Sequence, residues 1–190
     1  MILQSPNRCI VLGIDSGKNS GWGVLFPYYA QNSIVKLAGA GTADTHVKRK
    51  NAYEFAVEMA RILNLPLIIC RETWTPGWSK KKRSIKTILG LGASWGRWET
   101  VLEESSFPKS RIFTVTPNTW RQPILGLKPG KYSHDQAKQA AVVAFNSRWG
   151  NQITDKVTHD MAEGTLIAYY GLHDSRVADA IKNPRRLRKV

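Results

Sequence analysis

Four acidic residues stand at positions where this chain gives little local reason for a negative charge. Asp15 and Glu72 each close a short apolar run, whereas Asp160 and Glu163 lie three residues apart at the start of a helical pattern. The chain has only 14 acidic residues against 28 lysines and arginines, so these positions need an explanation. Hard divalent cations prefer oxygen ligands, and phosphoryl transfer can use a pair of such ions. An acidic metal pocket on a strongly basic protein indicates an enzyme that cuts a polyanion.

Each acid also has a simpler interpretation. Asp15 could form a turn with the glycine that follows it, and Asp160 with Glu163 is close to a helix capping box. A carboxylate that ends a buried strand must nevertheless be hydrated, paired or metal-bound. Arg71 is the neighbour of Glu72, but strand alternation directs it to the opposite face of the sheet. Taken together, the four acids favour metal coordination, and the histidine before Asp160 is left outside this set.

The composition describes one folded, basic domain. The 190 residues are 42% hydrophobic and carry a formal net charge of +14. We expect a single domain at residues 1–182, followed by a basic C-terminal tail at residues 183–190. The charge favours a nucleic-acid partner, because each lysine or arginine that contacts a phosphate releases a counterion. An anionic membrane surface is the weaker alternative, since no segment reads as a basic amphipathic helix.

Cysteine use and hydropathy bear on the compartment. Cys9 and Cys70 lie in apolar runs and lack the spacing of zinc sites, so we expect two buried free thiols. No apolar run approaches the ~20 residues that span a bilayer, and the start of the chain lacks the layout of a signal peptide. We therefore expect a protein of the bacterial cytoplasm with no membrane partner.

Hydrophobic periodicity predicts an α/β domain. The expected strands cover residues 8–15, 22–26, 33–41, 67–71 and 111–115, and the expected helices cover residues 51–63, 85–104, 133–149 and 158–172. The stretch between the fifth strand and the third helix is expected to be irregular. An antiparallel meander followed by two parallel crossovers gives a mixed five-stranded sheet of order 3-2-1-4-5, flanked by helices. Asp15 and Glu72 then lie side by side at the carboxyl ends of neighbouring strands, where open α/β sheets bind ligands.

An aromatic and basic loop is expected to follow Glu72. The candidates for DNA contact in this loop and at the start of the next helix are Trp74, Trp78, Lys80, Lys81, Lys82, Arg83 and Lys86. Cationic side chains suit phosphates, and an indole ring can stack on an unpaired base for about 1–3 kcal/mol. A solvated charge run, with the tryptophans in the core, is the simpler alternative.

Glycines mark two further segments. Residues 13–23 lack the spacing of dinucleotide-binding and Walker loops, and they lead to a strand rather than to a helix. An actin-type phosphate loop is a closer rival, but such folds need two such domains. Gly90, Gly92 and Gly96 each weaken the expected long helix by about 1 kcal/mol relative to alanine. Close packing of another helix there, at a subunit interface, or packing on the sheet would explain them.

An ordered set of motifs between residues 8 and 172 resembles a known superfamily. The matching stretches are residues 11–24, 68–72, 91–96, 119–126 with the lysines that follow, and 159–164. In this order they resemble the ribonuclease-H-like superfamily and, within it, the RuvC-type Holliday junction resolvases, in a phage-encoded branch. Glu163 stands where the family pattern has an aspartate, and it is one methylene longer.

The resemblance implies an endonuclease that resolves four-way DNA junctions by metal-dependent hydrolysis of phosphodiesters. Asp15 would bridge two Mg²⁺ ions, for which Mn²⁺ can substitute. Glu72 and Asp160 would complete the two metal sites, and Glu163 would bind or orient the second ion. All four acids are therefore expected to be both catalytic residues and metal ligands.

The same resemblance implies DNA contacts and an assembly. Lys131 would stabilise the transition-state phosphate, and Arg121 and Lys128 would contact the DNA backbone. A homodimer suits a junction, which presents two equivalent strands, and no small-molecule substrate is expected. A related nuclease for RNA:DNA hybrid or branched DNA and a non-catalytic junction-binding protein stay open as alternatives.

Overall fold

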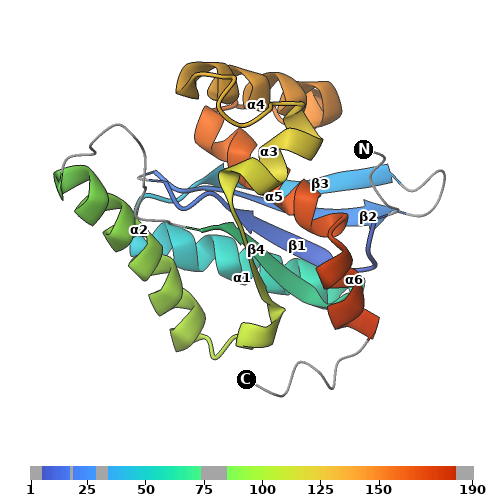
Figure 1. Ribbon diagram of the computed structural model, residues 1–190. Helices are drawn as coiled ribbons and strands as arrows, with labels where there is room; N and C mark the ends of the chain where they lie inside the picture. Colours follow the sequence, from blue (N-terminus) through green and yellow to red (C-terminus); the bar gives the residue numbers. More distant parts are fainter. Residues whose placement is uncertain (1–5, 18, 29–33, 74–84, 183–190) are drawn as a thin grey trace.

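The computed structural model describes residues 6–17, 19–28, 34–73 and 85–182. In these residues the chain forms one sheet between two layers of helices (Figure 1). The strands are β1 (Ile10–Ile14), β2 (Gly21–Tyr28), β3 (Ile34–Thr42), β4 (Leu67–Glu72) and β5 (Ile112–Val115). The helices are α1 (His46–Leu63), α2 (Ile85–Glu104), α3 (Pro117–Leu125), α4 (His134–Trp149), α5 (His159–Leu172) and α6 (Ser175–Lys182). Short 3-10 turns lie at Lys109–Arg111 and Gly150–Gln152.

The sheet has the predicted topology. Its order is β3-β2-β1-β4-β5, with antiparallel pairing from β1 to β3 and parallel pairing of β4 with both β1 and β5. Helix α1 makes the crossover between β3 and β4, and α2 makes the crossover between β4 and β5. The mixed five-stranded sheet flanked by helices is therefore confirmed.

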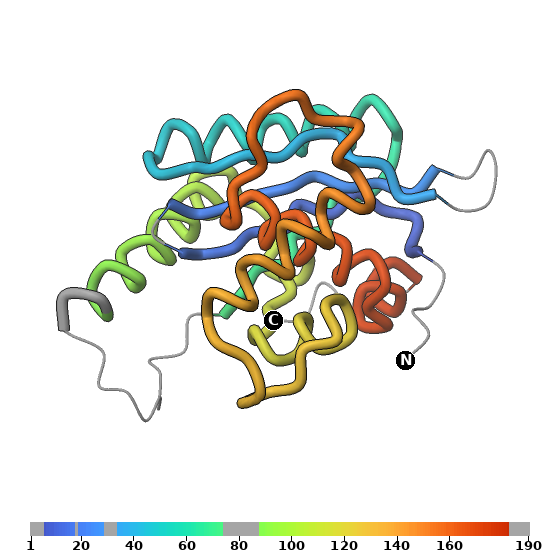
Figure 2. Tube along the Cα trace, turned by 90° about the horizontal axis from the view of Figure 1, so that it is seen from above, coloured from blue at the N-terminus to red at the C-terminus, as the bar shows by residue number. Residues whose placement is uncertain are grey.

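Strand β1 lies at the centre of two hydrophobic cores. Val11 packs into the core under α3 to α6, whereas Ile10, Leu12 and Ile14 pack into the core under α1 and α2. Figures 1 and 2 show these two groups of helices on opposite faces of the sheet. A strand covered on both faces must be apolar throughout, which explains why the run before Asp15 shows no polar alternation.

Two helices were not predicted. Helix α3 occupies part of the stretch expected to be irregular, where Thr116 caps the helix and Pro117 begins it. Proline is tolerated in the first turn because its missing N–H would have no partner there. Helix α6 was also missed, and α1 begins at His46 rather than at residue 51. The predicted irregular stretch is thus wrong for its first half.

The remaining global expectations concern thiols and membranes. Cys9 and Cys70 are buried and unbridged, as expected, and burial raises the pKa of both thiols to about 12. Across the described ranges, no helix combines the length and the apolar character needed to cross a bilayer.

Candidate active site

Strands β1 and β4 place two of the acids at one edge of the sheet. The parallel register pairs Ile14 with Arg71, so Asp15 and Glu72 follow at the carboxyl ends of adjacent strands. Asp15 is 8% exposed and Glu72 is partly buried. Arg71 points to the other face, where it pairs with Glu99 of α2 and not with Glu72. The predicted convergence of the two strand ends is confirmed.

Helix α5 brings the other two acids to the same edge. A Cβ on Gly21 would collide with the backbone carbonyl of Asp160, and a Cβ on Gly164 would collide with the backbone of Gly21. Glycine on both sides therefore allows the helix backbone to lie directly on the sheet. Asp160 and Glu163 consequently lie near the strand ends that carry the first two acids, and the charges of both act on Asp15.

Neither acid of α5 caps the helix. Thr158 is the N-cap residue, and its side chain accepts a hydrogen bond from the Met161 N–H at 3.2 Å. The capping-box interpretation of Asp160 and Glu163 is therefore wrong. Both carboxylates are left for partners outside the helix terminus.

At least one oxygen of each carboxylate contacts a neighbouring polar group. The donors are the Gly17 N–H to Asp15 Oδ1 (3.1 Å), Trp120 Nε1 to Glu72 Oε2 (2.8 Å), Arg121 Nη2 to Glu163 Oε1 (2.6 Å) and Asn19 Nδ2 to Asp160 Oδ2 (3.3 Å). The other Asp160 oxygen, Oδ1, lies 3.0 Å from His159 Nε2. Within the described ranges, no hydrogen-bond donor reaches Asp15 Oδ2, Glu72 Oε1 or Glu163 Oε2. As far as the described residues go, these three oxygens can accept a further ligand.

The acids repel one another in a poorly solvated site. Burial raises the pKa of Asp15 well above its ordinary value, and the charges of Glu72, Glu163 and Asp160 raise it further. Burial likewise raises the pKa of Glu72 to about 7, against the opposing charge of Arg121. A cluster of this kind gains free energy when it binds a cation or a proton.

The available ligand atoms suit a hard divalent cation, although the acids are not arranged as a complete coordination shell. All of these ligand atoms are carboxylate oxygens, which Mg²⁺ and Mn²⁺ prefer. In the part of the chain that the structure describes, no three histidine, cysteine or acidic side chains form a group that could hold a metal ion as they stand. Arg121 neutralises Glu163 in a largely buried ion pair and so competes with a metal for that acid.

The turn that carries Asp15 is held from behind by helix α2. Ser94 Oγ donates a hydrogen bond to the carbonyl oxygen two residues after Asp15 at 2.7 Å. Trp98 Nε1 donates to Ser20 Oγ, which in turn donates to the Asp15 carbonyl oxygen at 2.9 Å. The fully buried Arg49 of α1 donates to Ser94 Oγ at 3.2 Å. Side chains of α1 and α2 thus fix the backbone of the candidate catalytic turn.

The predicted basic contacts are placed in two different environments. The Arg121 side chain is only 13% exposed and pairs with Glu163, so it belongs to the carboxylate cluster and not to an outer surface. Lys128 and Lys131 are exposed between α3 and α4, and no ion pair joins either of them to a described acid. Phosphate contact by all three stays a prediction, and Arg121 would first have to exchange Glu163 for a phosphate.

Most of the aromatic and basic loop falls outside the described residues. This applies to Trp74, Trp78, Lys80, Lys81, Lys82 and Arg83. Lys86 lies in the first turn of α2, but its side chain is also outside the described part of the chain. The DNA contacts expected of these residues stay predictions.

Sequence reasoning missed three side chains that support the site. Trp120 holds Glu72, Asn19 holds Asp160, and Ser94 holds the turn after Asp15. Trp120 and Asn19 lie inside stretches that the motif comparison had already singled out, which is a usable signal. Ser94 also lies inside such a stretch, but its partner is 77 residues away, so the sequence does not show what it bonds to.

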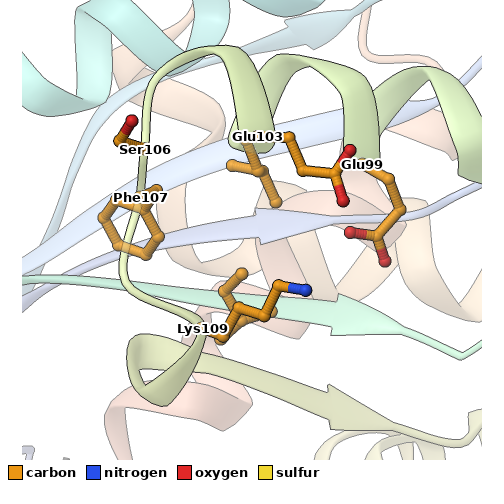
Figure 3. Close-up of a pocket in the computed structure, with 7 residues that line it drawn as sticks. Glu99, Glu103, Ser106, Phe107 and Lys109 are labelled. Atoms are coloured by element: carbon orange, nitrogen blue, oxygen red, sulfur yellow. The ribbon is translucent and has the colours of Figure 1, made fainter. Parts of the chain in front are cut away.

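A pocket of about 260 Å³ lies apart from the four acids (Figure 3). It opens between the end of α2 and the start of β5, and Figure 3 labels Glu99, Glu103, Ser106, Phe107 and Lys109 around it. None of the four clustered carboxylates lines it, and Glu99 is already paired with Arg71. The pocket is separate from the candidate active site.

Comparison with known proteins adds the fold. No protein-family profile and no curated protein sequence matches this chain. Two solved structures, Thermus thermophilus RuvC and T. thermophilus RuvC in complex with a Holliday junction substrate, each align with a TM-score of 0.55 and 16% identity over 90% of this chain and 95% of theirs. The yeast mitochondrial Holliday junction resolvase Ydc2 aligns with a TM-score of 0.43 and 14% identity over 96% of this chain and 84% of its own. The sheet order and the flanking helices show that the chain has the ribonuclease-H-like α/β fold of RuvC.

Proposed function

We propose that this chain is a structure-selective DNA endonuclease that resolves four-way junctions by metal-dependent hydrolysis of phosphodiester bonds. The observation that carries the proposal is the convergence of four carboxylates at one sheet edge of a protein with a net charge of +14. A basic surface attracts a polyanion, and an acidic cluster can meet its phosphate through a metal ion. The shared fold supports the proposal, because RuvC has been solved with a Holliday junction substrate.

The proposed cofactor is Mg²⁺, or Mn²⁺ in its place, with two ions in each site. Bound there, the metal would activate water and stabilise the leaving oxygen. Asp15, Glu72 and Glu163 would hold it through the oxygens that no described donor occupies, and Asp160 would complete the set. Asp15 is the proposed central ligand of the set, since the charges of the other three acids all act on it.

The surrounding residues keep these ligands in place. The Trp120 indole fixes the rotamer of Glu72, and Asn19 fixes that of Asp160. Arg121 offsets the negative charge of the cluster. If it exchanged Glu163 for a phosphate of the substrate, the Glu163 carboxylate would be free to bind a cation. Lys131 and Lys128, which are exposed beside the site's helices, would hold the phosphates of the substrate.

A homodimer is part of the proposal. Gly90 and Gly96 are exposed on α2, and a Cβ at either position would meet no atom of the described residues within 4 Å. Packing on the sheet therefore does not explain these two glycines. A second copy of the chain against this face of α2 would explain them, and it would give the assembly two sites for the two equivalent strands of a junction.

The experiment that tests this function uses an end-labelled four-way junction with Mg²⁺, Mn²⁺, Ca²⁺ or EDTA. We expect cleavage with Mg²⁺ and Mn²⁺, and binding with little cleavage in Ca²⁺, whose coordination is longer and looser. Plain duplex and RNA:DNA hybrid are assayed in parallel as alternative substrates. Preferential cutting of the hybrid would favour the related nuclease, and junction binding without cutting in any metal would favour a non-catalytic binding protein.

Two variants separate catalysis from folding. Asp15→Asn should abolish cleavage and leave junction binding intact or tighter, since it removes a negative charge that meets phosphate. Glu163→Asp should retain much of the activity, because it keeps the carboxylate. Loss of binding together with loss of fold in Asp15→Asn would make this acid a structural residue.

A further inference from the structure

A groove of about 750 Å³ leads from the candidate active site along helix α4. Asp160 and its hydrogen-bond partner Asn19 form part of the lining. Helix α4 and the segment that leads into α5 provide the rest of the lining. Helices α4 and α5 pack against each other (Figure 2). A molecule in this groove would therefore touch the carboxylate cluster at one place.

Three valines give the groove an apolar surface. Val142 and Val157 are partly buried and pack against the core below, whereas Val143 is 68% exposed. Concave sites with aliphatic walls and a few charged groups are typical of ligand sites. The groove is thus suited to a partner that presents apolar faces to it.

Two lysines add positive charge to the same groove. Lys138 and Lys156 both belong to its lining, and no ion pair joins either of them to a described acid. Their ammonium groups are available to anionic groups of a partner. Apolar faces alternating with anionic groups describe an unpaired nucleic-acid strand, whose bases and sugars are exposed between its phosphates. A duplex keeps its base faces stacked inside and presents mainly phosphates to such a surface.

We propose that this groove binds unpaired nucleotides of the DNA strand that is cut at the four carboxylates. The inference rests on the proposed nuclease function and adds a site on α4 to the loop of residues 74–86. The valines pack against sugar and base faces, and Lys138 and Lys156 hold phosphates. Binding in this groove would raise the affinity for branched DNA relative to plain duplex, because a crossover offers unpaired nucleotides.

A charge placed on the apolar surface tests the site. Val143→Glu should weaken binding to a labelled single strand and to a four-way junction by roughly tenfold, because a carboxylate there faces phosphates. Duplex binding should change little. Val47→Glu is the matched control, since Val47 is 65% exposed on α1, on the other face of the sheet. Binding is measured by fluorescence anisotropy in EDTA, and thermal melts verify that both variants fold.

The lysines are tested by salt dependence. Replacing Lys138 and Lys156 together by alanine should lower the slope of log K against log salt by about 1.4, at about 0.7 per single-strand phosphate contact. The control replaces Lys48 and Lys50, which already pair with Asp44 and Glu54, and should leave the slope unchanged.

The outcomes separate this inference from the proposed function. If the wild type never cuts a junction but the Val143 and lysine variants lose single-strand binding, the groove assignment stands and the nuclease proposal fails. If the wild type cuts and both variants bind every DNA as their controls do, the groove assignment is overturned. A protein partner would then be the occupant to look for.

Discussion

Replacing Glu72 with glutamine should change how the stability of the metal-free protein depends on pH. Burial raises the pKa of Glu72 from 4.5 to about 7 in the folded protein, whereas the unfolded chain titrates near the ordinary value. Between these two pKa values the folded state binds a proton that the unfolded state has released. The contribution of Glu72 to the free energy of unfolding is therefore fully present below the unfolded pKa, and it is lost as the pH rises through the folded pKa.

The size of this effect follows from the difference between the two pKa values. One pKa unit corresponds to about 1.4 kcal/mol, so Glu72 should cost the folded protein roughly 3 kcal/mol above pH 7. This is an upper figure, because the side chain keeps some solvent exposure. Asp15 acts in the same direction, since burial raises its pKa as well. Glutamine carries no charge and can still accept the Trp120 hydrogen bond through its carbonyl oxygen.

The assay is denaturant unfolding at several pH values between 5 and 8 in EDTA. Glu72→Gln should show a shallower fall in stability with pH and should exceed the wild type in stability at pH 8. Added Mg²⁺ or Ca²⁺ should stabilise the wild type more than the variant, because a ligand of the folded state raises its stability by mass action. Glu103→Gln, at an exposed site on α2, serves as the control. An unchanged pH slope in Glu72→Gln would refute the reasoning.

Three further predictions address the helix behind the site, the dimer and the loop. Trp98→Phe keeps an aromatic ring but deletes the hydrogen bond to Ser20 and leaves part of a fully buried site empty; it should cost about 2–3 kcal/mol of stability and lower kcat more than it alters KM, as steady-state kinetics would show. A Cβ at Gly96 would meet no atom of the described residues within 4 Å, so Gly96→Leu should fold normally and yet weaken dimerisation in light scattering; an undiminished dimer would contradict the proposed interface. Trp78→Ala should reduce junction cleavage more than duplex binding, and an unchanged cleavage rate would remove the base-stacking role from this residue.

The positions of two acids could be predicted because they depend on local pattern and on a general rule. The apolar runs before Asp15 and Glu72 predict buried strands, and the crossover rule makes those strands parallel neighbours. Their carboxyl ends then coincide, as the register of β1 with β4 confirms. The close approach of α5 was less visible, although the glycines of β1 and β2 provide a signal for it.

Only the tertiary structure decided which partners the acids have. Trp120 reaches Glu72 across 48 residues, and Arg121 reaches Glu163 across 42. Both donors lie on α3, whose prolines gave the sequence the character of an irregular stretch. The sequence by itself therefore determined the sheet, its order and the edge at which the acids meet, because strand periodicity and crossover handedness are local properties. The ion pair and the buried hydrogen bonds that set the charge of the site depend on the packing of α3 and α5 on the sheet, which no local pattern specifies.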